Sequence, residues 1–359
     1  MHANSLNMTS DGLALSPAEY AKLLTELSES GKLAADNYGI GGNVIELEAA
    51  MAELLGKEAA IVMPTGTMAN LLAVQYLATG AQKIIVQQAS HLYNDSGDCS
   101  ASLAGLQLMP LGKRATFSAN DVHGVLNRIK NGKSDSPLGV ISIESPVRRL
   151  DGEMFDPAAL DEVIEMAGER DIRLHLDGAR LPVMSAYTGK SLKSLSMPFD
   201  TIYVSLYKCF NSLSGGVLAG DRKLIQRLGH WRRRNGGGMA QLWPIAAVAL
   251  HYLPGVVDRL VEAVKISEAF FNLLNDDGRF IHTPVSGGSS VSRIKISGTD
   301  RQGCEKFRRH LLSHGVVMPG FDGDPCGFSI KVNESWRHRT PEELFMAFQS
   351  AADSARISR

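Results

Sequence analysis

The segment SLYKCFNSLSGG, residues 205–216, carries one lysine, Lys208, directly after an apolar run that is typical of a β-strand. That run covers residues 201–205, and the strand pattern resumes at residues 217–220 after a glycine-ended turn. A lysine is uncommon at such a position, because burying an ammonium group costs free energy unless the group is paired or neutralised. A lysine held there can have a lowered pKa and act as an amine nucleophile that forms a Schiff base. The alternative is a strand-end lysine whose charged tip reaches water.

A second segment, RLHLDGAR at residues 173–180, reads as a short buried strand that ends in an acid, a glycine and an arginine. The acid is Asp177, and it precedes Lys208 by one strand–loop unit. A pyridoxal phosphate (PLP) site needs such a pair, because the carboxylate keeps the ring nitrogen protonated and the lysine binds the aldehyde carbon. We therefore predict a PLP site with Lys208 and Asp177 as catalytic residues.

Several further motifs occur in an order that is typical of one enzyme family. In chain order the matching segments are Tyr38-Gly39, Glu46-Leu47-Glu48, PTGTMANL at residues 64–71, His91, HLDGARL at residues 175–181, Lys208 and GGGM at residues 236–239. With these motifs the chain resembles the threonine aldolase/β-eliminating lyase family of PLP enzymes, which has the aspartate-aminotransferase-like fold (fold type I). The resemblance covers residues 8–255, and its most specific parts are the DGARL and GGGM blocks.

The resemblance implies a lyase that cleaves β-hydroxy-α-amino acids of the L-threonine or L-allo-threonine type to glycine and an aldehyde. It also implies PLP as the cofactor and a homodimer or homotetramer whose active site lies at the subunit interface. A lyase that eliminates a β-leaving group on the same scaffold is the alternative. A PLP-binding protein without its own catalysis is a third interpretation. An aminotransferase is disfavoured only by the family likeness, because its chemistry would use the same residues.

A glycine turn after the apolar run at residues 59–63 predicts where the cofactor phosphate binds. Pro64-Thr65-Gly66-Thr67 leads from this run into a helix expected over residues 68–77. Free backbone N–H groups and the helix dipole converge at a helix N-terminus and attract anions. We predict that Gly66 and Thr67 hold the phosphate; a plain helix cap is the alternative.

His91 follows another predicted strand, residues 83–87. Its imidazole is expected to stack on the pyridine ring, as the family histidine does, and to relay protons. His91, or a water that it orients, is the predicted base for the β-hydroxyl group; a packed loop histidine is the alternative. Arg180 lies three residues after Asp177, near the phenolic oxygen of the ring, and its fork of donors also suits a substrate carboxylate.

The resemblance adds three residues to the predicted site. Ser10 matches a family serine that contacts the substrate carboxylate, although a turn serine would look the same. Tyr38 is expected to face the substrate, and Arg233 matches a basic residue that reaches the phosphate of the neighbouring subunit.

The chain also departs from the family pattern. The departures are at Gly41-Gly42, Ser96, Ser145-Pro146 and Ala240. Arg149 matches a family arginine that either faces the substrate or forms a salt bridge. The family binds the substrate carboxylate with an arginine near residues 328–332, and this chain has none in register. The candidates to replace it are Lys331, Arg337 and Arg339.

Composition limits the remaining classes of function. The chain has 359 residues, is 44% hydrophobic and 21% charged, and has a formal net charge of −1, which gives no electrostatic case for binding nucleic acid or an anionic membrane. Its four cysteines form no CxxC pair, so neither a metal site nor a disulfide framework is predicted, and reduced thiols in a cytoplasmic enzyme are expected. No run has the length of a membrane span, and the N-terminus does not resemble a signal peptide.

Short apolar strands alternate with helices between residues 59 and 220, which predicts an α/β fold with a mostly parallel sheet and helices on both faces. We expect an N-terminal segment over residues 1–19, a large α/β/α PLP-binding domain over residues 20–255, and a smaller C-terminal α+β domain over residues 256–359. The first nine residues are expected to lack regular structure. Active sites of such folds lie at the carboxyl ends of the strands, where the chemistry-bearing residues Thr67, His91, Asp177 and Lys208 are all predicted to be.

Overall fold

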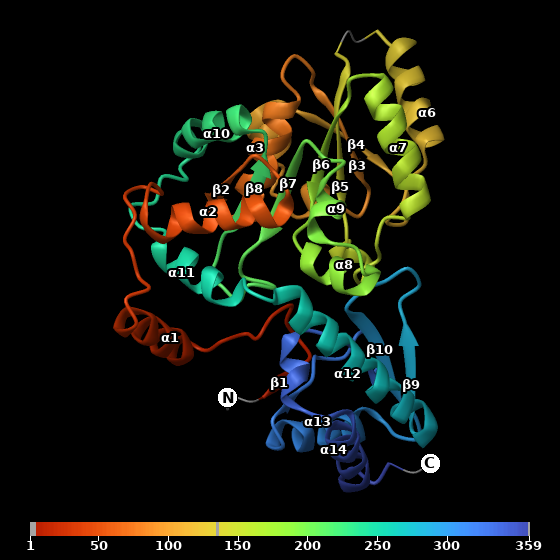
Figure 1. The fold of residues 1–359 in the computed structure, drawn as a ribbon. Helices are drawn as coiled ribbons and strands as arrows, with labels where there is room; N and C mark the ends of the chain where they lie inside the picture. The colour runs from red at the N-terminus through yellow and green to blue at the C-terminus, as the bar shows by residue number, and fades with distance from the viewer. Residues whose placement is uncertain (1–4, 134–135, 358–359) are drawn as a thin grey trace.

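A seven-stranded sheet forms the centre of the larger part of the molecule (Figure 1). The computed structural model describes residues 5–133 and 136–357. The strand order is β2-β8-β7-β6-β5-β3-β4, and all neighbours are parallel except β8, which is antiparallel to both β2 and β7. The mostly parallel α/β fold predicted from the sequence is confirmed. The strands are β2 (Ala59–Met63), β3 (Lys83–Gln87), β4 (Gln107–Leu111), β5 (Leu138–Glu144), β6 (Arg173–Asp177), β7 (Thr201–Ser205) and β8 (Gly216–Gly220).

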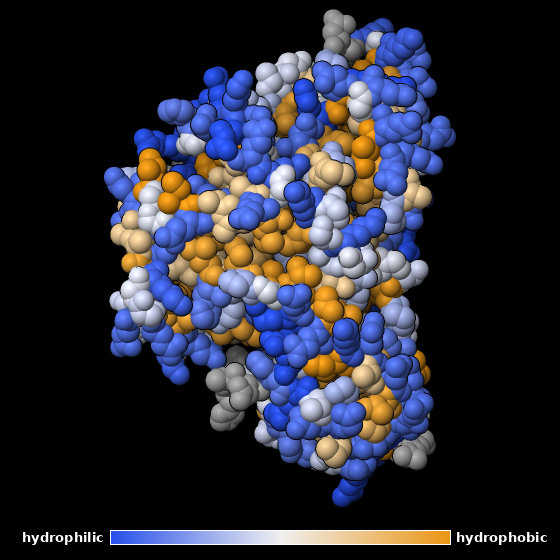
Figure 2. Space-filling view, in the orientation of Figure 1, coloured by the Kyte–Doolittle hydropathy of each residue, from blue (hydrophilic) through white to orange (hydrophobic). Residues whose placement is uncertain are grey.

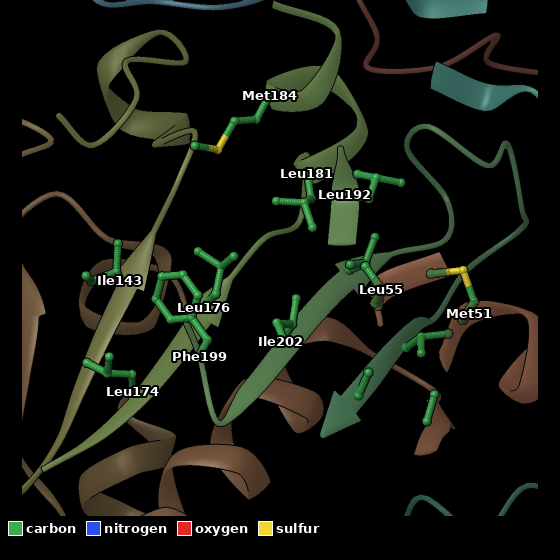
Figure 3. Packing of buried hydrophobic residues seen from close by; sticks show 14 of the residues in the cluster. Met51, Leu55, Ile143, Leu174, Leu176, Leu181, Met184, Leu192, Phe199 and Ile202 are labelled. Atoms are coloured by element: carbon green, nitrogen blue, oxygen red, sulfur yellow. The ribbon is translucent and has the colours of Figure 1, made fainter. Parts of the chain in front are cut away.

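Helices cover both faces of this sheet. Successive side chains of a strand point to opposite faces, and in this sheet the side chains on both faces are apolar and need to be buried. Val62 and Val204 face one apolar cluster, which also contains residues of α2, α6, α7, α8, α9 and α11. Ile61 and Tyr203 face the opposite side, where they pack against α3 and α10. These helices are α2 (Gly42–Leu55), α3 (Gly66–Leu77), α6 (Ala119–Lys130), α7 (Pro157–Glu169), α8 (Leu181–Thr188), α9 (Leu192–Ser196), α10 (Arg222–Arg234) and α11 (Trp243–Tyr252). Figure 3 shows the first cluster, with Leu181 and Leu192 beside Leu176 and Ile202.

The remaining segments of this part are short or lie at its edge. Ser16 caps α1 in a capping box with Glu19, as the sequence S-P-A-E indicates. The segments are α1 (Pro17–Glu29), α4 (His91–Asn94), α5 (Cys99–Ala104) and a 3₁₀ turn, η1 (Arg148–Leu150). Within the described residues no single helix is long and apolar enough to cross a membrane; α11 and the helix that follows it, α12 (Val256–Asp277), reach that length and apolarity only together, with a bend of 57° between them.

The C-terminal part has its own small sheet and its own core. Strands β12, β10 and β9 form an antiparallel sheet in this order. Its core is rich in aromatic side chains, among them Phe270, Phe307, Trp336 and Phe348. The elements are α12 (Val256–Asp277), β9 (Phe280–Pro284), β10 (Val291–Ile296), α13 (Arg301–Ser313), β11 (Val316–Val317), β12 (Gly327–Lys331), η2 (Glu334–His338) and α14 (Pro341–Ser354). The domain boundaries predicted at residues 19 and 255 stay a prediction.

The start of the chain belongs to the core of this C-terminal part. Leu6–Asn7 forms strand β1, which pairs in parallel with β11, and Leu6 and Met8 are fully buried in the aromatic-rich core. The expectation that residues 1–9 lack regular structure is therefore wrong for β1, and residues 1–4 lie outside the described residues. Two apolar side chains among polar neighbours are a weak signal, and the partner strand that orders them lies more than 300 residues away.

Candidate active site

Side chains from the carboxyl ends of the central strands line one cavity of about 240 Å³. Parallel pairing of β6 with β7 places Asp177 opposite Tyr203, so the end of β6 lies beside the turn that carries Lys208. Among the residues that line the cavity are Gly66, Thr67, Asn70, His91, Glu144, Arg148, Asp177, Arg180 and Lys208. The cavity thus gathers Gly66, Thr67, His91, Asp177, Arg180 and Lys208 from the predicted site.

Lys208 is buried in this cavity, with 9% of its surface exposed. Burial lowers the pKa of Lys208 to about 8; the Arg180 guanidinium adds to this effect, and Asp177 opposes it. A larger fraction of the amine is therefore unprotonated near neutral pH than for an exposed lysine. This is the state in which a lysine acts as a nucleophile.

Asp177 is held by hydrogen bonds on both carboxylate oxygens. Asn70 Nδ2 donates to Oδ2 over 2.6 Å, and the backbone N–H of Ala179 donates to Oδ1 over 3.2 Å. Asn70 lies on α3 and is buried, with 1% of its surface exposed. The carboxylate is therefore fixed in position by α3 as well as by its own turn.

A chain of buried hydrogen bonds continues behind Asn70. His175 Nε2 lies 3.0 Å from Asn70 Oδ1, and His175 Nδ1 lies 2.8 Å from the Thr201 hydroxyl. Burial lowers the pKa of His175 to about 4, so its imidazole is neutral at pH 7. Because the Asn70 amide NH₂ faces Asp177, Asn70 Oδ1 must accept from His175 Nε2–H, and Nδ1 must accept from the Thr201 hydroxyl. Every donor in this chain points toward the Asp177 carboxylate.

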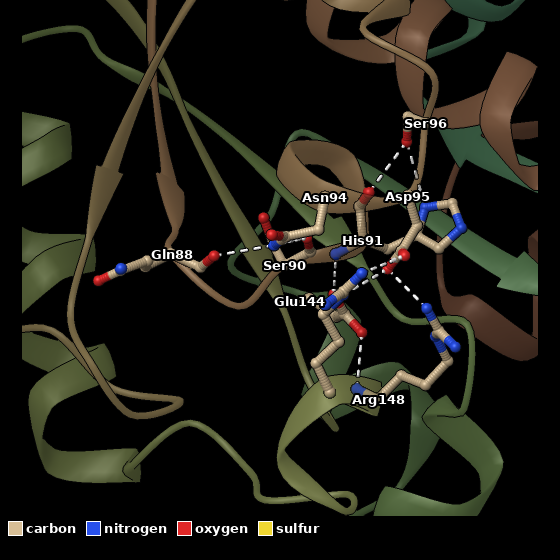
Figure 4. Close-up of polar contacts among 9 residues, drawn as sticks. Gln88, Ser90, His91, Asn94, Asp95, Ser96, Glu144 and Arg148 are labelled. Atoms are coloured by element: carbon tan, nitrogen blue, oxygen red, sulfur yellow. Dashed lines mark hydrogen bonds and ion pairs between the residues drawn. The ribbon is translucent and has the colours of Figure 1, made fainter.

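His91 opens the short helix α4, where its backbone N–H donates to Glu144 Oε2 over 2.5 Å (Figure 4). The Ser96 hydroxyl donates to the His91 carbonyl over 3.0 Å and also lies 3.3 Å from His91 Nδ1. Since the hydroxyl has a single proton, Nδ1–H must be the donor in the second contact, which leaves a lone pair on Nε2. Burial lowers the pKa of His91, so the ring is neutral at pH 7.

Glu144 is a second buried acid on the cavity wall. Its Oε1 accepts the backbone N–H of Arg148 over 2.8 Å, and its Oε2 accepts that of His91. Burial, together with the negative charge of Asp177, raises the pKa of Glu144. Glu144 was not predicted as a site residue, although an acid that ends an apolar strand, as Asp177 does, was an available signal.

Arg180 is fixed by Asp11 at the other side of the cavity. Its Nε and a terminal nitrogen donate to the two oxygens of Asp11 over 3.1 and 2.9 Å, and Lys331 Nζ lies 3.2 Å from Asp11 Oδ1. Although burial opposes ionisation, Arg180 and Lys331 hold the pKa of Asp11 well below its usual range. Two cations thus share one carboxylate, which leaves one positive charge for an incoming carboxylate.

Of the three basic residues proposed to replace the missing family arginine, Lys331 alone reaches this group. Arg337 pairs with Glu262 over 2.5 Å, and Arg339 donates to the His314 carbonyl over 3.1 Å. Both contacts lie on the surface of the C-terminal part. The position of Lys331 follows from the register of β12, which the sequence alone does not fix.

Three predicted residues do not line the cavity of the single chain. The Ser10 hydroxyl donates to the Gly12 carbonyl, so Ser10 lies beside Asp11 but is turned into its own loop. Tyr38 is 48% exposed, and its ring lies 6.0 Å from the guanidinium carbon of Arg233. Tyr38 and Arg233 thus meet each other on the surface rather than in the cavity.

The residues of the cavity fit PLP. Gly66 begins α3, and a Cβ at this position would lie 2.1 Å from the Tyr203 hydroxyl, so a larger residue would close this corner. The Thr65 hydroxyl caps the helix by accepting the N–H of Met68, while no acceptor within the described residues binds the N–H groups of Gly66 and Thr67, which suit a phosphate. Lys208 and Asp177 supply the amine and the carboxylate that the aldehyde carbon and the ring nitrogen of PLP require.

Comparison with known proteins shows similarity to one family of lyases. The family model described as β-eliminating lyase matches residues 30–292. A low specificity L-threonine aldolase from Escherichia coli O157:H7 is 32% identical over 273 residues, which are 74% of this chain and 81% of that protein. A low-specificity L-threonine aldolase from Candida albicans is 30% identical over 71% of this chain and 69% of that protein.

Solved structures share the fold over almost the whole chain. A candidate L-allo-threonine aldolase from Listeria monocytogenes has a TM-score of 0.79 at 23% identity and covers 98% of this chain and 97% of that chain. A serine palmitoyltransferase from S. paucimobilis, solved with bound PLP and myriocin, has a TM-score of 0.66 at 18% identity and covers 99% of this chain and 89% of that chain.

The hydrogen bond from Asn70 to Asp177 generates a prediction about cofactor binding. Asn70→Ala removes one donor to the carboxylate and leaves His175 Nε2–H without its acceptor. We expect PLP to bind roughly 10- to 100-fold more weakly, the range for losing a hydrogen bond to a charged group, and its absorption maximum to shift. The measurement is the PLP dissociation constant from equilibrium dialysis. Asn131→Ala, at the exposed end of α6, is the control, and equal affinities for the two variants would contradict the prediction.

Proposed function

The chain belongs to the β-eliminating lyase family, and we propose that it is an aldolase that cleaves β-hydroxy-α-amino acids of the L-threonine or L-allo-threonine type into glycine and an aldehyde. As a member of this family it is a PLP-dependent lyase. The observation that carries the proposal is the extended match to low-specificity L-threonine aldolases. In addition, Lys208, Asp177 and His91 line a single cavity of this chain.

Four residues would hold the cofactor. Lys208 would bind the aldehyde carbon and Asp177 the ring nitrogen, while Gly66 and Thr67 would bind the phosphate with the free N–H groups of α3. When bound, PLP supplies an electron sink for the charge that develops on the substrate Cα. His91, on the cavity wall, would stack on the ring and keep water out.

The α-carboxylate of the substrate would bind to Arg180 and Lys331. These two cations share only Asp11, so an added carboxylate balances their charge. The guanidinium of Arg180 is held rigidly by its two bonds to Asp11, which lowers the entropy lost on binding. This contact fixes which substituent of Cα faces the His91 side of the cavity.

His91 Nε2 would accept the proton of the β-hydroxyl group. The Cα–Cβ bond then breaks, the β-carbon leaves as an aldehyde, and Cα takes up one proton to give glycine. Ser96 keeps the lone pair on Nε2 by accepting Nδ1–H. The Lys208 amine, with its lowered pKa, is suited to exchange protons near neutral pH.

The role of His91 predicts a pH dependence. Burial lowers the pKa of His91 below its ordinary value of 6.5, and the base works in its neutral form. The loss of kcat/KM that protonation of His91 causes should therefore lie below pH 6.5. His91→Phe should keep the stacking but lose about 10²- to 10⁴-fold in kcat, together with this acid limb. An unchanged acid limb in His91→Phe would contradict the assignment.

Aldehyde release from a panel of amino acids tests the proposed function. The purified PLP-loaded protein should produce glycine and aldehyde from L-threonine, L-allo-threonine or phenylserine. Lys208→Ala is the matched negative control, since it keeps the cavity but removes the amine. No aldehyde from any of the three at high enzyme concentration would overturn the proposal. Pyruvate and ammonia from serine or cysteine, without glycine, would instead favour the β-eliminating lyase.

We extend the proposal to a homodimer or homotetramer whose subunits complete each other's active site. Tyr38 and Arg233 are exposed next to each other, and Figure 2 shows a hydrophobic surface over α2 and α11. Ile40, just before α2, and Ile45, in its first turns, are 70% and 56% exposed. A second copy would cover this area and bring Arg233 to the phosphate. A monomer mass in sedimentation equilibrium would contradict the proposed assembly.

The four cysteines are free and buried, as expected for the cytoplasmic location that we include in the proposal.

A further inference from the structure

Two arginines and one aspartate form a cationic cluster at the cavity, defined here as Asp95, Arg148 and Arg149. Arg149 binds both oxygens of Asp95, with Nε at 3.0 Å from Oδ2 and a terminal nitrogen at 2.8 Å from Oδ1. Arg148 adds a single bond of 2.6 Å to Oδ2. Two guanidinium groups thus share one carboxylate, and the cluster has one formal positive charge in excess.

Only Arg148 of the two arginines lines the cavity. Its backbone N–H donates to Glu144 Oε1, and the other oxygen of Glu144 accepts the backbone N–H of His91 (Figure 4). Arg148 and His91 are therefore fixed to the same buried side chain and lie on the same side of the cavity. Among the described residues, Nε and the second terminal nitrogen of Arg148 have no acceptor, so its fork is free to bind a ligand.

The other cations of the cavity already have functions in the proposed reaction. Lys208 would bind the cofactor, and Arg180 would bind the α-carboxylate together with Lys331, which does not line the cavity but shares Asp11 with Arg180. The Arg148 side chain is 48% exposed. It is needed neither for binding of the cofactor nor for binding of the α-carboxylate. A guanidinium group that faces a cavity with free donors is suited to a planar anion such as a carboxylate.

We infer that Arg148 binds an anionic group on the Cβ side of the substrate, so that the preferred substrates are β-hydroxy-α-amino acids with a second carboxylate. This inference rests on the proposed function, in which His91 accepts the proton of the β-hydroxyl group. Cβ and its substituents then lie on the side of the cavity that carries His91 and Arg148. Arg148 and His91 are bound to the same Glu144 side chain, so the anionic group is expected close to the carbon that carries the β-hydroxyl group. The smallest substrate of this class is 3-hydroxyaspartate.

Cleavage of 3-hydroxyaspartate follows the same steps as cleavage of threonine. The hydroxyl proton passes to His91 Nε2, the Cα–Cβ bond breaks, and Cα takes up one proton. The products are glycine and glyoxylate, and no oxidant, reductant or further reactant is needed. Arg148 would hold the carboxylate that becomes that of glyoxylate.

The test compares kcat/KM for 3-hydroxyaspartate, as separate diastereomers, with kcat/KM for L-threonine in the PLP-loaded protein. Arg148→Met should lower the ratio of these two values roughly 10- to 100-fold, the range for losing a hydrogen bond to a charged group, and Arg148→Lys should restore part of it. Arg149→Met is the matched control, because Arg149 binds the same carboxylate and is equally exposed but does not line the cavity. An equal loss in Arg149→Met, or an unchanged ratio in Arg148→Met, would overturn the inference.

A binding measurement separates failure of this inference from failure of the proposed function. L-Aspartate and L-alanine lack the β-hydroxyl group, so their binding to the PLP-loaded protein is read from the absorption spectrum without cleavage. Arg148→Met should weaken the binding of L-aspartate and leave that of L-alanine unchanged. If L-threonine is cleaved but L-aspartate binding is insensitive to Arg148, the inference fails and the aldolase stands. If no β-hydroxy amino acid is cleaved, the aldolase fails, and the L-aspartate titration still decides whether Arg148 binds an anion.

Discussion

The parallel pairing of β6 with β7 is the constraint on which the active site depends. It places Asp177, the last residue of β6, beside Tyr203 on β7, and the turn after β7 then brings Lys208 to the same edge of the sheet. The reversed strand β8 follows at once and fixes both ends of that turn. Both faces of the sheet are packed under helices, and a one-residue slip would move every side chain to the opposite face, away from its packing partners.

Asp177 and Arg180 are buried at the cavity, and each is held by partners from other elements of the fold. Asp177 is supported by Asn70 and, behind it, by His175 and Thr201, while Arg180 is supported by Asp11. Removing one partner from such a buried group leaves an uncompensated charge or an unpaired donor. The free energy lost is then several times larger than for the loss of a contact on the surface. Residues that never touch the substrate are therefore expected to control how strongly the cofactor binds and in which state.

The sequence predicted the parts of the site that are encoded locally. Lys208, Asp177, His91 and the turn at Gly66 each lie at a strand end that short apolar runs reveal, and the fold class, the family and the dependence on PLP were confirmed. Asn70 was missed because its partner Asp177 is 107 residues away and only the packing of α3 brings them together. Lys331 could not be chosen from three candidates without the register of β12. Ser10, Tyr38 and Arg233 lie outside the cavity of one chain, and their roles stay predictions.

The central claim is that the amine of Lys208 binds the aldehyde of PLP while Asp177 binds its ring nitrogen. The most direct measurement is borohydride reduction of the PLP-loaded protein, followed by proteolysis and mass spectrometry of the peptides. A pyridoxyl group on the peptide that contains Lys208, and its absence from the other lysine-containing peptides, is the predicted result. A label on a different lysine, or no covalent label in a protein that retains PLP, would contradict the claim.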